Sequence, residues 1–202
     1  MKHLELPEIA RMMSEDSPIL QGCRHLAEVC PVCAERFAQV EALMKHVGHW
    51  DPEVAVREGL DADDLLAALL AAGPDLAGWT SRVEEKPEYQ TWGVAWLALE
   101  RAQALLAEPS TRSQARDFAL LAAAIAGTLE DSVYHSESIA DLRALAQATA
   151  VAAAAPGAGT TDLANTVRQM AAVVAALEQG TGEEAVEKRV LSLLSQVLHG
   201  WQ

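Results

Sequence analysis

Large apolar residues recur at steps of three and four along most of this chain, a spacing that predicts α-helices. Between positions 92 and 105 they are Trp92, Trp96, Leu99 and Leu105, which share one helical face. The sequence lacks the period-two alternation of β-branched and aromatic residues that is typical of strands. Proline and glycine mark the ends of the apolar stretches. We therefore expect an all-α chain, with helices near 5–14, 18–28, 31–48, 61–72, 74–85, 87–107, 110–129, 136–155, 161–179 and 182–199.

The last five of these helices have about twenty residues each and are joined by short turns, as in α-hairpin arrays. Alanine is abundant and only 4% of the residues are aromatic. Because alanine allows helix axes to approach closely, this composition favours long antiparallel helices packed through small residues. The pattern predicts an array resembling the tetratricopeptide solenoid.

The net charge of the chain restricts the classes of partner that it is expected to bind. Its 202 residues carry 29 acidic side chains against 15 Lys and Arg, a net charge of -14. Nucleic acids and anionic membranes require clustered cations, so neither is an expected partner. The sequence contains neither an apolar stretch long enough to cross a bilayer nor the pattern of a signal peptide. We expect the protein to act in the cytoplasm.

Three cysteines lie close together, at positions 23, 30 and 33, and their odd number argues against a disulfide framework. The spacing His25-x4-Cys30-x2-Cys33 places one imidazole and two thiols where they can bind a single tetrahedral zinc ion. Pro31 ends one predicted helix at Cys30 and begins the next, so that Cys33 falls in a first helical turn. The sequence predicts one structural Zn²⁺, held by His25, Cys30 and Cys33.

A structural zinc site needs a fourth ligand. Cys23 and His3 are the preferred candidates, ahead of the more distant His46 and His49. Two other interpretations stay open for the cluster: inert cysteines buried in a helix pair, and a redox-active dithiol formed by Cys30 and Cys33. Dithiol oxidoreductases place this motif after a strand, and no strand is predicted here.

The stretch His25-Leu26-x3-Cys30-Pro31-x-Cys33 resembles the zinc knuckle of zinc-binding anti-sigma factors. The chain as a whole resembles bacterial regulatory proteins in which such a knuckle precedes tetratricopeptide-like helices. The later matching segments are Trp50-Asp51, the helix with Leu99 and Ala102, 119–129 followed by Tyr134, 141–144 and 180–182. The resemblance implies a module that binds another protein and contributes no catalytic residue.

Residues 51–90 carry ten acidic side chains and three basic ones, half of the net charge in a fifth of the chain. Asp61, Asp63 and Asp64 form the densest acidic group. They are explained either by a solvated face of short connecting helices, with Asp61 or Asp63 as an N-cap, or by a docking strip for a basic partner. We divide the chain into a zinc-knuckle region (1–50), acidic connecting helices (51–90) and a helical array (91–202).

The five tryptophans fall into two groups. Trp92 and Trp96 lie one helical turn apart and are predicted to be core residues. Trp50, Trp79 and Trp201 lie near predicted turns, where an exposed indole can anchor a partner.

No Walker loop, G-x-S-x-G, H-E-x-x-H or G-x-G-x-x-G motif occurs, so we do not expect an enzyme. The leading hypothesis is a zinc-binding helical adaptor or regulatory protein that acts through another protein. Within the same class, the alternative is an anti-sigma factor that sequesters a sigma subunit. In a different class, the chain is a thiol redox sensor or dithiol oxidoreductase that uses Cys30 and Cys33.

Overall fold

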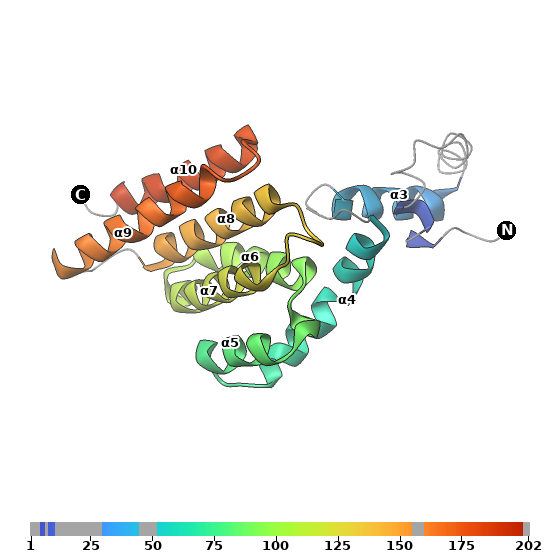
Figure 1. The fold of residues 1–202 in the computed structure, drawn as a ribbon, viewed down its shortest axis with the longest axis horizontal. Coiled ribbons are helices and arrows are strands. Elements are labelled where there is room, and N and C mark those ends of the chain that lie inside the picture. The colour runs from blue at the N-terminus through green and yellow to red at the C-terminus, as the bar shows by residue number, and fades with distance from the viewer. Residues whose placement is uncertain (1–4, 7, 11–29, 45–51, 155–159, 200–202) are drawn as a thin grey trace.

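The computed structural model describes residues 5–6, 8–10, 30–44, 52–154 and 160–199 (Figure 1). No β-strand occurs among them, which confirms the all-α prediction for this part of the chain. No helix in the same residues is both long and apolar enough to cross a membrane. The helices are α3 (Pro31–Met44), α4 (Pro52–Ala71), α5 (Leu76–Glu85), α6 (Trp92–Leu106), α7 (Arg112–Thr128), α8 (Ser136–Ala154), α9 (Thr160–Leu177) and α10 (Glu184–His199), with short 3-10 helices η1 (Pro87–Tyr89) and η2 (Pro109–Thr111).

Helix α4 begins at Pro52, so the prediction that this helix starts at 61 is wrong. Proline is well suited to a first helical turn, and the helix continues through Gly59 despite the low helix propensity of glycine. The interpretation of Asp61 or Asp63 as an N-cap is therefore also wrong, because both lie in the middle of α4.

The predicted helix 87–107 is divided in two by local hydrogen bonds. Gln90 donates from its side-chain amide to the carbonyl of Val83 at 2.7 Å, which fixes the turn after η1. Thr91 then acts as the N-cap of α6, its hydroxyl accepting from the Val94 N–H at 3.3 Å. A threonine cap of this kind satisfies one of the N–H groups that a helix start leaves without an intrahelical partner.

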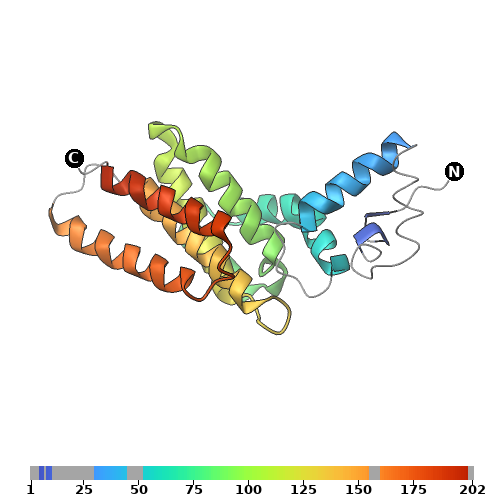
Figure 2. The same cartoon turned by 90° about the horizontal axis from the view of Figure 1, so that it is seen from above.

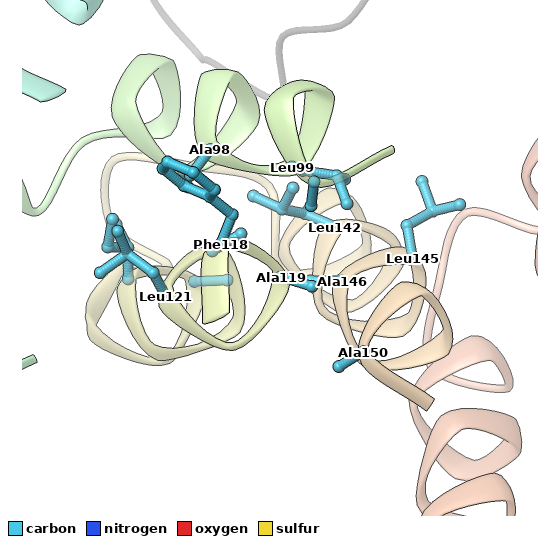
Figure 3. Packing of buried hydrophobic residues seen from close by; sticks show 14 of the residues in the cluster. Ala98, Leu99, Phe118, Ala119, Leu121, Leu142, Leu145, Ala146 and Ala150 are labelled. Carbon is cyan, nitrogen blue, oxygen red and sulfur yellow. The ribbon is translucent and has the colours of Figure 1, made fainter. Parts of the chain in front are cut away.

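Helix α8 lies at the centre of the fold, packed against α6, α7, α9 and α10 (Figures 1 and 2). Ala119 of α7 and Ala146 of α8 are fully buried where the two helices meet, and the larger side chains of Leu99 and Leu142 lie beside them (Figure 3). Small residues at helix contacts let the axes approach, and the longer ones supply the buried apolar area. Leu66, from α4, belongs to the same core cluster, which therefore includes residues on both sides of position 90.

The N-terminal part lies at the opposite end of the molecule from α9 and α10 (Figures 1 and 2). Helix α3 packs against α4, and its Phe37 and Val40 are buried. Ile9 and Ala10 are also fully buried, and Arg36 of α3 forms an ion pair with Glu5 at 3.8 Å.

A carboxylate joins three segments at the crossing of α4 and α6. Glu58 of α4 accepts a hydrogen bond from the Trp92 N–H at 3.1 Å and another from the Tyr134 hydroxyl at 2.9 Å. Tyr134 is buried and stacks on Trp92, with ring centroids 6.2 Å apart. Because Trp92 is the first residue of α6, the carboxylate also lies at the positive end of that helix.

Replacing Tyr134 with Phe is expected to lower the free energy of unfolding by about 1.5 kcal/mol, the low end for a hydrogen bond to a charged group. The Trp92 N–H still satisfies part of the Glu58 carboxylate in this variant. Urea denaturation measures the change. Tyr89→Phe is the matched control, since Tyr89 is also buried but its hydroxyl has no hydrogen bond among the described residues. Equal stability losses in the two variants would refute the role of the Glu58 contact.

The same contact predicts a pH dependence at the alkaline end. Burial and the neighbouring Glu58 carboxylate raise the pKa of Tyr134 well above its usual range. Deprotonation of Tyr134 therefore favours the unfolded state. The contribution of this hydroxyl to the free energy of unfolding is complete below the unfolded pKa of about 10 and is lost as the pH rises beyond it. The stability difference between the wild type and Tyr134→Phe should narrow above this pH.

A second carboxylate, which is buried, fixes the turn between α9 and α10. Asp141 of α8 accepts from the backbone N–H of Thr181 at 3.2 Å and from its hydroxyl at 2.5 Å. A Cβ atom at Gly180 would collide with the other Asp141 oxygen, so any larger residue here would have to displace this carboxylate. The contact attaches the start of α10 to the central helix.

Candidate metal centre and acidic surface

The two described cysteines lie at the beginning of α3. Cys30 directly precedes the helix and is half-buried, whereas Cys33 lies in the first turn and is buried. The carbonyl of Cys30 accepts from the Ala34 N–H at 2.9 Å, which continues the helical hydrogen bonding back to Cys30. Pro31 suits the first helical position because the N–H that proline lacks would have no intrahelical acceptor there. Neither sulfur is part of a disulfide.

The environment of Cys30 favours its thiolate. The backbone N–H of Cys33 donates to the Cys30 sulfur and lowers the pKa of that thiol, against the opposing effect of burial. The Cys33 side chain and the Val32 N–H contribute further in the same direction. The two cysteine side chains are therefore in contact. The lowered pKa of Cys30 favours the thiolate, which is the form in which cysteine binds a metal or reacts.

The remaining proposed zinc ligands, His25, Cys23 and His3, lie outside the described residues, as do His46 and His49. Within the described part of the chain, no group of three or more His, Cys, Asp and Glu side chains could hold a metal ion. Two adjacent sulfur donors can supply two of the four ligands of a tetrahedral zinc site. Cysteine sulfurs are among the ligands that zinc prefers in proteins, so Cys30 and Cys33 suit this ion.

Three aspartates of α4 lie on its solvent-facing side. Asp61, Asp63 and Asp64 are all exposed, and the large apolar Leu60 beside them is 46% exposed. Asp63 forms an ion pair with Arg101 of α6 at 3.2 Å. Both of these side chains are well solvated, so the pair adds little to stability. Leu60, Asp61 and Asp64 follow one another at steps of one and three and form the outer surface of the helix, which we call the α4 acidic face.

Trp79 is half-buried and contacts other residues of the fold. Its indole N–H donates to the carbonyl of Gly73 at 2.8 Å, and its ring stacks on Phe118 of α7 with centroids 5.9 Å apart. These contacts explain Trp79 as a residue that joins α5 to α7. Trp50 and Trp201 lie outside the described residues. Trp92 is buried and Trp96 half-buried, and their rings stack at 6.5 Å in agreement with the core prediction.

Two polar contacts escaped the sequence analysis: Glu58 with Tyr134, and Asp141 with Thr181. Glu58 is one of ten acidic residues in its segment, and nothing in the spacing separates it from the exposed ones. Asp141 is likewise one of several charged residues in its segment, with Glu137 and Arg143 close by. Its partner, forty positions away, has no sequence signal.

In comparisons with known proteins, no family model, no curated protein and no solved structure matches the chain.

Proposed function

We propose that this chain is a zinc-binding helical adaptor, a regulatory protein that works in the cytoplasm by binding another protein. The observation that carries the proposal is the contact between the Cys30 and Cys33 side chains at the start of α3, with Cys30 disposed towards thiolate. His25 is assigned as the third ligand, and Cys23 or His3 as the fourth. When bound, zinc would tie α3 to the preceding chain, a structural role that needs no catalytic residue.

The partner-binding part is the helical array, which we propose to be of the tetratricopeptide-like hairpin type. Its support is the packing of consecutive helices, α6 on α7 and α7 on α8, through buried alanines. The α4 acidic face suits a basic partner because complementary charge speeds association and sets orientation. Trp50 and Trp201 are further candidate contacts.

Zinc analysis of the purified wild-type chain tests the metal. We expect about one zinc per chain, retained through dialysis, as for a structural site. A metal-free chain with two readily oxidised thiols would reject zinc and support the redox alternative, in which Cys30 and Cys33 form a reversible disulfide.

Affinity capture from the native host tests the partner. A partner of the α4 acidic face is retained by the wild type and lost by the double variant Asp61→Lys/Asp64→Lys. The charge-matched control is Glu108→Lys/Asp131→Lys, which changes two exposed loop carboxylates. Loss of the partner with both variants would mean that net charge, not this face, determines binding. Recovery of a sigma subunit would favour the anti-sigma alternative.

A further inference from the structure

Helix α9 carries apolar residues on its outer side as well as on its buried inner side. Its inner side packs on α8, with Val173 fully buried and Met170 and Leu177 against the core. On the outer side, Val167 is 55% exposed and Val174 43% exposed. Ala171 and Ala175, which are also exposed, share this side with them. A surface helix normally turns a polar side to water, so the outer side of α9 has the character of an interface.

Two charged side chains flank the last nine residues of α9, Arg168 from within the helix and Glu178 just after its end. Residues 169–177 contain no charged side chain, although the chain as a whole carries -14. Arg168 precedes this stretch and Glu178 follows it, and both are exposed. In the described part of the chain neither has an ion-pair partner. They lie about 15 Å apart along the axis, too far to pair within one helix.

We infer that the outer side of α9 binds the same side of α9 in a second copy of this chain, with the two helices antiparallel. A two-fold axis at the level of Val173 places Arg168 of each copy opposite Glu178 of the other, and Ala171 opposite Ala175. A parallel pair would instead place Arg168 opposite Arg168. The charge pattern is thus self-complementary only in the antiparallel sense, as an interface with two-fold symmetry requires.

The position of α9 leaves room for the second copy. The helix lies at the end of the molecule away from α3 in both views and at its outer edge in Figure 2, whereas Figure 1 shows it between α10 and α8. The small residues on its outer side permit close approach of the two backbones. With the axis at Val173, residues 169–177 of the two helices overlap over about 14 Å, and this pair covers well below the ~1,200 Å² of a tight interface. The dimer is therefore reversible and concentration-dependent.

A charge-swap experiment tests this dimer by sedimentation velocity over roughly 5–500 µM, a range that covers weak dissociation constants. The wild type should shift from monomer to dimer. Arg168→Glu and Glu178→Arg should each weaken the dimer by about tenfold or more, because like charges then face each other. The double variant Arg168→Glu/Glu178→Arg should restore it. Since residues 168 and 178 do not touch within one chain, restoration reports a contact between copies.

The matched control reverses an ion pair inside one helix. Lys188 and Glu184 of α10 pair at 2.6 Å, and the double variant Glu184→Lys/Lys188→Glu should dimerise like the wild type. Val174→Asp should abolish the dimer without changing the melting temperature of the monomer, because Val174 is exposed.

Three results would overturn the proposal: a wild type that stays monomeric at the highest concentration, a double variant that is no better than the single ones, or a Val174→Asp chain that still dimerises. None of them depends on zinc, since α3 lies at the other end of the molecule.

Discussion

A Cys33→Ser variant is expected to bind zinc more than about a hundredfold more weakly than the wild type, because loss of an outer partner of a ligand alone costs about 10–100-fold. The substitution preserves the size of the side chain and removes the soft sulfur donor. Cys30→Ser should have the same effect. Competition with a chromogenic chelator gives both affinities.

The control lies between the two cysteines. Val32 is 43% exposed, so Val32→Ser introduces the same hydroxyl into the same turn without removing a ligand. This variant should retain its zinc. If Cys30→Ser and Cys33→Ser also retain it, the proposed metal site is wrong.

Loss of zinc should leave the central helices folded. The core cluster around α6, α7 and α8 contains no residue of α3, so its packing does not depend on the metal. Circular dichroism of the Cys33→Ser chain should therefore keep most of the helical signal and the main thermal transition. Complete unfolding on metal removal would show instead that the N-terminal region stabilises the whole fold.

Gly93→Ala is expected to lower the free energy of unfolding by about 3 kcal/mol, the upper end of the cost of overpacking. A Cβ atom at Gly93 would lie 2.5 Å from the carbonyl oxygen of Glu58 and 2.8 Å from its carbonyl carbon. Both atoms belong to the backbone of α4, so relief requires α4 and α6 to separate. That separation would also strain the hydrogen bond between Glu58 and Trp92.

The matched control is Gly127→Ala in α7. A Cβ atom at Gly127 would meet nothing within 4 Å, so alanine should stabilise this chain by up to about 1 kcal/mol through its higher helix propensity. The two substitutions are chemically identical and should have opposite signs in chemical denaturation. A stabilised or unchanged Gly93→Ala chain would contradict the close crossing of α4 and α6.

Local signals in the sequence determined the helices. The spacing of apolar residues and the positions of Pro and Gly located α8 within a residue of the predicted 136–155, and α7, α9 and α10 within about two. These local signals gave wrong boundaries for two helices. Helix α4 starts at Pro52 rather than 61, and the predicted helix 87–107 is interrupted by the side-chain contacts of Gln90 and Thr91.

The sequence by itself determined the all-helical character of the described chain, the core role of Trp92 and the start of a helix at Cys30-Pro31, because each follows from neighbours within a few positions. Only the tertiary structure decided that Glu58 meets Tyr134 and that Asp141 meets Thr181, since these contacts join residues 76 and 40 positions apart. It also separated the exposed Asp61 and Asp64 from the bonded Glu58. Acidic residues of one helix look alike in sequence, and burial, which differs from one side of the helix to the other, gives them different roles.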